Sequence, residues 1–285
     1  MRQLRTCTVP IEFKGGIFMK KYLSFFRMRF LMGVQYRAAA AAGVTTQFAW
    51  GCLEILVYRA FYQDNAAAFP MSFQAVVNYI WLQQTFLMLF MAWRIEGEIL
   101  SGISDGNIAY ELCRPIRIYD MWFARTAAYR VSGTLLRCIP VFAVTLLIPA
   151  PYGLSLPPDP QTAALFLVSL LLGLLVMTGI GVLMYVCCCF TISIQGIRIF
   201  YGAASELLSG QIVPLPFMPE AVRRVVSVLP FASVQDVPLR IYSGNLGGAA
   251  AIRAVGLQVV WLVVLVAAGR LLAGRAERRM VLQGG

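Results

Sequence analysis

Carboxylate side chains are the residues of this sequence best suited to chemistry, and they fall into two groups. Glu54 and Glu206 each lie inside a long apolar run, where a charged group is costly unless it faces protein, water or a partner charge. Such a carboxylate can carry a proton or bind a substrate. The second group supplies hydrogen-bond acceptors in one polar stretch, residues 94–130, and comprises Glu96, Glu98, Asp105 and Glu111.

Several kinds of catalytic site are excluded by composition. The sequence contains no histidine, so imidazole bases, histidine metal ligands and Ser-His triads are ruled out. Its seven cysteines have no spaced pairs, and we interpret them, including Cys187-Cys188-Cys189, as packing residues. There is no Gly-x-x-x-x-Gly-Lys-[Ser/Thr] loop to hold the phosphates of ATP. Energy for any transport must therefore come from a partner chain or an ion gradient.

The elements that position these carboxylates are predicted to be membrane helices. Hydrophobic residues make up 59% of the chain and charged residues only 13%, whereas soluble domains carry about 25% charged residues. Apolar windows of about 20 residues predict roughly six spans, near 40–62, 75–93, 131–149, 162–190, 197–215 and 252–274. We therefore expect an all-α, polytopic membrane protein with one transmembrane domain over residues 19–285.

Basic residues predict the orientation of the spans. Lys and Arg gather before the first span, within 94–130 and after the last span, whereas 63–74 and 150–161 have none. Both termini and the 94–130 insert are therefore predicted to be cytoplasmic. The net charge of +11 is spread along the apolar runs, which indicates a lipid bilayer as partner and not nucleic acid. Residues 1–18 are expected to be disordered or an upstream extension.

The insert begins with a helical pattern. Ile95, Ile99 and Ile103 recur at i, i+4 and i+8, which is typical of a helix lying at an interface. Either it docks a partner, or it rests on lipid headgroups. Its net acidity favours docking, because anionic lipid prefers Lys and Arg at such a face.

The stretch 209–244 is predicted to contain broken external helices after the fifth span. Gly210, Pro214 and Pro216 cannot continue a regular helix, and irregular backbone at membrane depth needs protein or a water-filled cavity around it. We expect this segment to cap a pathway. Its aromatic residues would form an apolar external gate or serve as interface anchors, and they include Phe217, Phe231 and Tyr242.

Glu54 is the deepest charge within the predicted spans. It would be structural if it accepted hydrogen bonds from Gln47, Gln83 or Gln84, and the alternative is a direct role with substrate or proton. Two arginines within the spans, Arg59 and Arg137, can snorkel to the membrane surface.

The run from Gly106 to Ile116, GNIAYELCRPI, followed by Trp122-Phe123-Ala124-Arg125, resembles the cytoplasmic signature of the permease subunits of type-2 ATP-binding-cassette exporters. Pro214-Leu215-Pro216 and Ile241-Tyr242-Ser243-Gly244 extend the match. The resemblance implies a permease in the bacterial plasma membrane that pairs with a second, non-identical permease and two copies of a separate ATPase. That ATPase would bind ATP and Mg, and this chain would bind no cofactor.

The resemblance implies that the insert at 94–130 couples the chain to the ATPase and that the segment 209–244 forms a gate. The expected coupling residues are Glu96, Glu98, Gly102, Gly106, Tyr110, Glu111, Arg114 and Pro115. The expected pathway or gate residues are Glu54, Glu206, Gly210, Pro214, Pro216, Phe217, Phe231 and Tyr242. 

Two other classes of protein are alternatives to the permease. A proton-coupled secondary transporter would use Glu54 or Glu206, but such carriers usually show an internal repeat, and the two halves give no convincing match. An intramembrane enzyme would need histidine clusters or paired aspartates, which the sequence lacks. The permease is therefore the preferred interpretation, with a cargo that the aromatic and methionine content indicates to be amphiphilic.

Overall fold

A computed structural model of the chain describes residues 15–35, 37–65, 68–112, 116–191 and 193–279. Within these ranges the protein is helical and has no β-strand. Three helices are long and apolar enough to cross a membrane, judged by length and composition: α7 (Ile118–Leu147), α8 (Pro160–Cys188) and α12 (Gly248–Arg279). They overlap the third, fourth and sixth predicted spans.

The other helices lie before α7 and between α8 and α12. Those before α7 are α1 (Gly15–Val34), α2 (Arg37–Asn65), α3 (Phe73–Thr85), α4 (Leu87–Phe90), α5 (Gly97–Ser104) and α6 (Ile108–Leu112). Those after α8 are α9 (Ile194–Leu208), the 3-10 helix η2 (Leu215–Phe217), α10 (Glu220–Val226) and α11 (Asp236–Tyr242). Of the expected extension 1–18, residues 15–18 belong to α1, and residues 1–14 lie outside the described ranges.

Two predicted spans are shorter in the structure than the sequence indicated. The span at 75–93 divides because Phe86, with φ −103° and ψ 15°, ends α3 and the four-residue α4 follows. The span at 197–215 ends at Leu208, because Gly210 adopts φ +82° and Pro214 follows it. The fifth span is thus a 15-residue helix followed by irregular backbone.

The insert at 94–130 was predicted to be one separate polar element, and the structure differs from this prediction. Its last part, residues 118–130, is the start of α7, so the helix that enters the third span begins inside the insert. Arg125 and Arg130 lie in this part and are buried. The insert is therefore continuous with the bundle.

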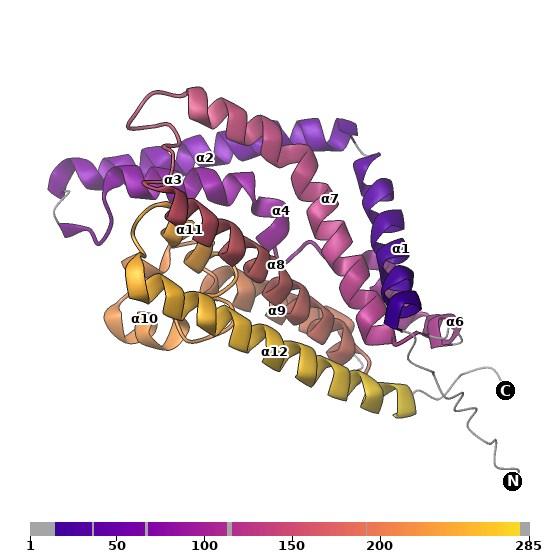
Figure 1. The fold of residues 1–285 in the computed structure, drawn as a ribbon. Helices are drawn as coiled ribbons and strands as arrows, with labels where there is room; N and C mark the ends of the chain where they lie inside the picture. The colour runs from indigo at the N-terminus through magenta and orange to yellow at the C-terminus, as the bar shows by residue number, and fades with distance from the viewer. Residues whose placement is uncertain (1–14, 36, 66–67, 113–115, 192, 280–285) are drawn as a thin grey trace, which may run out of the picture.

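The long helices form a bundle in which α8 packs against both α7 and α12, and α1 packs along α7 (Figure 1). The helix α6 and the C-terminal end of α12 lie at one end of the bundle, near the start of α7. The helix α10 lies at the opposite end. The short helices α6 of the insert and α10 of the 209–244 segment are therefore far apart.

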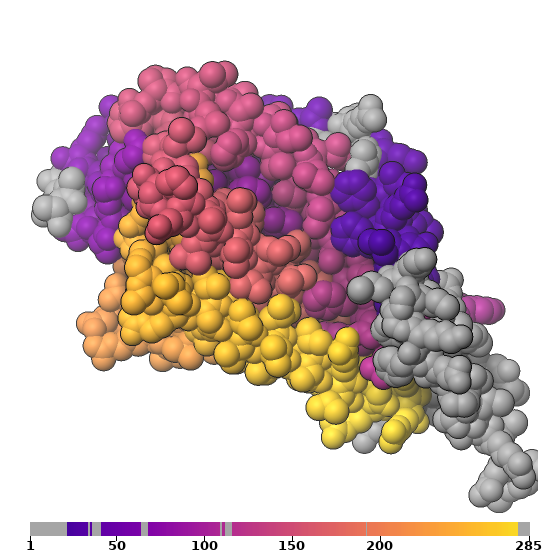
Figure 2. Space-filling model, in the orientation of Figure 1, coloured from indigo at the N-terminus to yellow at the C-terminus, as the bar shows by residue number. Residues whose placement is uncertain are grey.

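The helix α12 runs along one face of the molecule as a continuous band (Figure 2). Its outward side chains, among them Ile252, Val263 and Leu271, are apolar and exposed, which fits contact with lipid. On its inner side Gln258 is fully buried, and its Nε2 donates to the carbonyl oxygens of Ser233 at 2.7 Å and Ser169 at 3.1 Å. This amide joins α12 to α8 and to the segment before α11.

Local capping fixes the start of α8. Asp159 accepts hydrogen bonds from the backbone N and the Oγ1 of Thr162, both at 2.8 Å, and Pro160 occupies the first helical position. These hydrogen bonds lower the pKa of the exposed Asp159 carboxyl. At the other end of α8, Cys188 is buried, as expected of a packing residue, whereas Cys52 on α2 is exposed and differs from that prediction.

Candidate functional site

Arg125 on α7 holds three carboxylates of the insert. Its Nη2 lies 2.8 Å from Oε1 of Glu96 and 3.1 Å from Oε2 of Glu98, and its Nη1 lies 2.7 Å from Oε1 of Glu111. Only 8% of the Arg125 side chain is exposed. A guanidinium offers five N–H donors in a planar fork, which suits it to several carboxylates at once. We call Arg125, Glu96, Glu98, Glu111 and Arg29 the ionic cluster.

Arg29 on α1 is the second cation of the ionic cluster. Its Nη2 forms ion pairs with Glu96 and with Glu98. Glu96 is 3% exposed, so both cations share a carboxylate that is almost removed from water. The indole Nε1 of Trp122 donates to the second oxygen of Glu111 at 2.7 Å. The ionic cluster thus joins α1, α5, α6 and α7 at one point.

The apolar pattern of the insert explains why α5 lies where it does. Ile99 is buried, and Ile95 and Ile103 are partly buried against the main core, as the i, i+4, i+8 spacing predicts. Glu96 occupies the N-cap position of α5 without a side-chain capping hydrogen bond, and its backbone N–H donates to the hydroxyl of Tyr185 on α8 at 2.8 Å. The hydrophobic side of α5 therefore faces the bundle.

Arg130, five residues beyond Arg125 along α7, fixes the chain that leads into the insert. Its Nη1 donates to the carbonyl oxygens of Leu89 at 2.8 Å and Met91 at 3.0 Å. These carbonyls lie at the end of α4, where a helix leaves such groups unpaired. The Arg130 side chain is 1% exposed. The buried guanidinium of Arg130 thus supplies hydrogen-bond donors to the backbone carbonyls left unpaired between the second predicted span and α5.

The structure brings together some of the predicted coupling residues. Glu96, Glu98 and Glu111 gather on Arg125, so their carboxylates serve contacts within the chain first, although Glu98 remains 64% exposed. A Cβ atom at Gly102 would meet nothing within 4 Å, and Gly106 adopts φ +74° in the turn between α5 and α6. Tyr110 is 76% exposed. Two predicted residues, Arg114 and Pro115, lie outside the described ranges.

The predicted gate segment is held by a buried carboxylate, Asp236. It is 1% exposed, accepts a hydrogen bond from the backbone N of Leu215 at 3.1 Å and pairs with Arg240 at 3.2 Å. The hydroxyl of Tyr79 donates to the carbonyl oxygen of Gly210 at 3.0 Å. Polar contacts therefore fix the irregular backbone that follows α9. The prolines of this stretch, Pro214 and Pro216, are both buried.

Glu54 accepts hydrogen bonds from Gln84 at 3.3 Å and from Gln83 at 3.4 Å. This confirms two of the three amide partners expected for it, whereas the buried Gln47 side chain has no hydrogen-bond partner within the described residues. Glu54 and Phe217 line an open groove of about 460 Å³ beside α2, together with Trp50, Val57, Phe61 and Ile212.

The other predicted gate residues are distributed differently. Phe217 packs on Tyr58, with ring centroids 5.3 Å apart, at the groove. Tyr242 is buried against Phe166 of α8, with the two ring centroids 5.0 Å apart, and it does not line the groove. Phe231 and Glu206 are half-buried and also lie outside its lining. Of the predicted set, Glu54 and Phe217 meet there.

Three functional candidates were not predicted from the sequence: Arg125 was named only within the family resemblance, Arg130 was counted only among the basic residues of 94–130, and Asp236 was not singled out. Arg240, four residues after Asp236, was the available signal for a helical ion pair. For Arg125, the signal was its place among Trp122 and other large apolar residues. Among the described residues, no cluster of three His, Cys, Asp or Glu side chains could hold a metal ion.

These helices and their exposed apolar faces define a multi-pass membrane protein. The chain belongs to the ABC-2 family of transporter proteins, whose family model matches residues 48–284 and so includes both the insert and the gate segment. No match was found among curated proteins. Membrane components of this family act as permeases and generally work with an ATPase subunit.

Proposed function

We propose that this chain is the permease subunit of an ATP-driven exporter and that α5 and α6 couple it to a separate ATPase chain. In this proposal the ATPase binds ATP and Mg, and the chain pairs with a second, non-identical permease. Both termini lie in the cytoplasm of a bacterial cell. The observation that carries the proposal is the ionic cluster, which ties a surface element to two helices of the bundle.

The inner and outer sides of the insert have different roles in this account. On the inner side, Glu96 and Glu111 are paired with Arg125, and separating a buried charge pair is costly. A force on α5 or α6 is therefore passed to α7 and, through Arg29, to α1. On the outer side, Tyr110 offers an exposed aromatic ring, the kind of side chain that anchors protein interfaces.

The pathway in this proposal runs past the groove beside α2. Trp50, Val57 and Phe61 leave this face of α2 apolar and exposed, and Phe217 closes one side of the groove. An amphiphilic cargo suits such a surface, since the groove is mostly apolar and carries one carboxylate, Glu54. 

The half-buried position of Glu54 in this groove also supports a second candidate function, a proton-coupled carrier. The two candidates differ in their energy source. The carrier would work without an ATPase and would need a proton on Glu54. The permease would need the ATPase and would use Glu54 as a hydrogen-bond acceptor.

The proposal is tested by isolating the chain from its native membrane in mild detergent and measuring the mass of the intact assembly. We expect a complex that contains an ATPase and a second permease of different mass. A stable assembly without any ATPase would contradict the proposal.

The orientation has its own test, with single cysteines at Ser104 in α5 and at Leu156 before α8 in a cysteine-free chain. Both positions are exposed. An impermeant maleimide added to intact cells should label Leu156→Cys and not Ser104→Cys. Labelling of Ser104→Cys from outside would place the insert on the wrong side of the membrane for an ATPase.

A further inference from the structure

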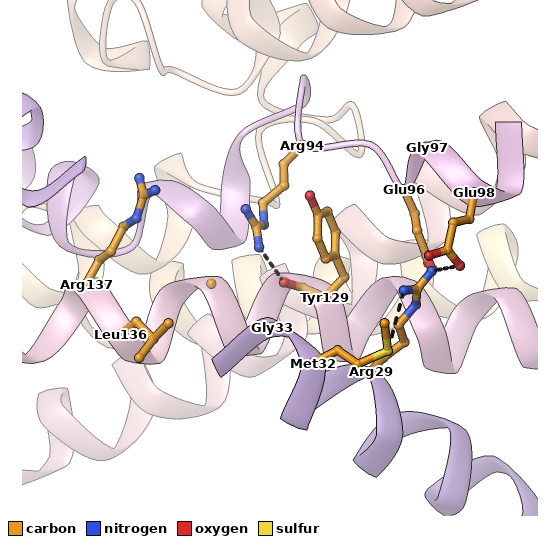
Figure 3. A pocket seen from close by; sticks show the side chains of 11 residues that line it. Arg29, Met32, Gly33, Arg94, Glu96, Gly97, Glu98, Tyr129, Leu136 and Arg137 are labelled. Carbon is orange, nitrogen blue, oxygen red and sulfur yellow. Dashed lines mark hydrogen bonds and ion pairs between the residues drawn. The ribbon is translucent and has the colours of Figure 1, made fainter. Parts of the chain in front are cut away.

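Two cavities lie beside α1 and α7. The cavity in Figure 3, of about 480 Å³, lies between these helices and the chain that connects α4 to α5. Its glutamates, Glu96 and Glu98, point toward Arg29 and pair with it, so this cavity belongs to the ionic cluster. The other cavity, of about 430 Å³, lies among α1, α7, α8 and α12. None of its described lining residues belongs to the ionic cluster or to the groove beside α2, and we call it the α12 cavity.

One ion pair lies in the α12 cavity. Arg270 of α12 directs two nitrogen atoms, Nη2 at 2.8 Å and Nε at 2.9 Å, to the same oxygen of Asp120 on α7, Oδ1. The other oxygen, Oδ2, is buried and accepts no hydrogen bond within the described residues. The Asp120 side chain is 11% exposed, whereas that of Arg270 is 51% exposed. Half of a largely buried carboxylate is therefore left without a donor, although such oxygens normally have one.

Tyr119, next to Asp120, adds a second unpaired polar group to the lining. Its side chain is 2% exposed, and its hydroxyl has no hydrogen-bond partner in the part of the chain that the structure describes. A Cβ atom at Gly269 of α12 would come within 2.2 Å of Cε2 of Tyr119, so the ring lies directly on the backbone of α12. Packing on Gly269 therefore fixes the ring at the cavity.

The rest of the α12 cavity is apolar. Leu262, Val266 and Arg270 follow one another at four-residue spacing, so they share one face of α12. Over this distance the helix rises about 12 Å. Phe123 of α7 and Leu175 of α8 complete the apolar walls. The cavity thus suits an amphiphile, because a charged pair at one end is followed by apolar surface.

The apolar lining continues onto exposed surface of α8 and α12. Leu171 of α8 and Val263 of α12 are 57% and 63% exposed. In the opposite direction, α12 continues beyond Arg270 into a basic end with Arg275, Arg278 and Arg279. Asp120 lies in the first turn of α7. The ion pair is therefore placed toward the polar ends of both helices, and the apolar lining leads toward the middle of α12.

We propose that the α12 cavity binds a membrane lipid with a zwitterionic ethanolamine headgroup. The ammonium group would donate hydrogen bonds to Oδ2 of Asp120 and to the hydroxyl of Tyr119. The phosphate would lie against the exposed side of Arg270, and the acyl chains would follow Leu262 and Val266. A purely cationic ligand would be repelled by Arg270, and a purely anionic ligand by Asp120, whereas a zwitterion matches both.

A methylation series of lipids tests this inference, which goes beyond the coupling proposal and needs no ATPase. From phosphatidylethanolamine through its N-methyl and N,N-dimethyl forms, each step removes one N–H donor at constant charge, and phosphatidylcholine has none. The full chain is placed in nanodiscs with equal amounts of phosphatidylcholine and one other member, and native mass spectrometry measures the retained lipids. We expect phosphatidylethanolamine to be enriched roughly tenfold, which corresponds to about 1.4 kcal/mol, and the enrichment to fall along the series. Equal retention of phosphatidylethanolamine and phosphatidylcholine by the wild-type chain would overturn the proposal.

Two variants test whether the preference arises at this cavity. Asp120→Asn removes the charge that attracts the ammonium group, and Tyr119→Phe removes only a hydroxyl that has no partner within the described residues. Both should lower the enrichment. Asp105→Asn and Tyr110→Phe are matched controls, because both residues are exposed on the insert and outside the cavity lining, and they should keep it. Wild-type enrichment in both Asp120→Asn and Tyr119→Phe would overturn the site. If Asp120→Asn failed to fold, the methylation series and Tyr119→Phe would still decide the proposal.

The headgroup without acyl chains, glycerophosphoethanolamine, distinguishes a lipid from a soluble ligand. Added to phosphatidylcholine nanodiscs, it should not be retained, because it gains nothing from the apolar lining. Retention at the level of phosphatidylethanolamine, with loss in Asp120→Asn, would keep the headgroup site and overturn a membrane lipid as its ligand.

Discussion

Arg125 Nη1 lies 2.7 Å from Glu111 Oε1, and through this contact α6 is fastened to the start of α7. The same guanidinium reaches Glu96, the N-cap residue of α5. One side chain therefore fixes both short helices of the insert to a helix that continues into the bundle. In the account given above, this fastening lets an event at the surface of the insert move α7.

Arg125→Gln should destabilise the protein, because Glu96 is buried and would keep only Arg29 as a charged partner. Removing one member of a buried pair typically costs about 3–5 kcal/mol. The melting temperature should fall well below that of Arg27→Gln, which removes an exposed charge from α1. Equal melting temperatures for the two variants would show that the ionic cluster does not hold the insert.

Asp236→Ala should loosen the gate segment, because Leu215 N and Arg240 would lose a buried acceptor. Glu220→Ala is the matched control, since Glu220 also pairs with an arginine four residues later, Arg224, but on an exposed surface. We expect a loss of about 3 kcal/mol or more for Asp236→Ala and about 0.5 kcal/mol or less for Glu220→Ala. Thermal unfolding measures both, and similar losses would contradict the assigned role of Asp236.

Helical periodicity and loop composition were sufficient to predict much of the architecture. The lengths of the apolar runs predicted the positions of α7, α8 and α12. Glycine and proline at 210–216 correctly predicted that regular helix ends after the fifth span. The break at Phe86 could not be predicted, because no glycine or proline marks it. The contact that follows it could not be predicted either, because Arg130 lies 39 positions after Met91 and binds the carbonyl oxygens of Leu89 and Met91 at the end of α4.

Glu54→Gln separates the two candidate functions. A glutamine keeps a carbonyl oxygen that can accept from Gln83 or Gln84, but it cannot take up or release a proton. If the chain is an ATP-driven permease, membrane abundance and stimulated ATPase activity of the complex should stay near the wild-type values. Loss of transport in Glu54→Gln with normal assembly would instead favour the proton-coupled carrier.

Gly102→Leu should leave the fold unchanged, because a Cβ atom there would meet nothing within 4 Å. Leucine also favours helix over glycine by up to about 1 kcal/mol, so the melting temperature should be equal or slightly higher. The added side chain would instead meet an ATPase docked on α5. Retention or stimulation of the ATPase should therefore fall.

Gly256→Leu on α12 is the control for this experiment, since that position is also open and lies away from the insert. It should retain the ATPase as the wild-type chain does. An equal reduction in both variants would mean that the effect of Gly102→Leu is not specific to α5.

The roles of the acidic residues show what the sequence could not supply. Glu96, Glu98 and Glu111 were predicted as acceptors for an ATPase, whereas in the structure they pair with Arg125 of the same chain. Pairing across four helices depends on how α1 and α7 pack, and no periodicity within the insert contains that information. Of the predicted coupling residues, the exposed Tyr110, the open Gly102 and the 64% exposed side chain of Glu98 are accessible to a partner.

The most direct measurement is photocrosslinking from position 110, where Tyr110 is replaced by benzoylphenylalanine in the native membrane. The account predicts a crosslink to an ATPase, identified by mass spectrometry through its Gly-x-x-x-x-Gly-Lys-[Ser/Thr] loop, and none when the same probe replaces Leu156 at the far end of the bundle. Crosslinks from position 110 to lipid alone would contradict the account and show that the insert rests on the membrane surface.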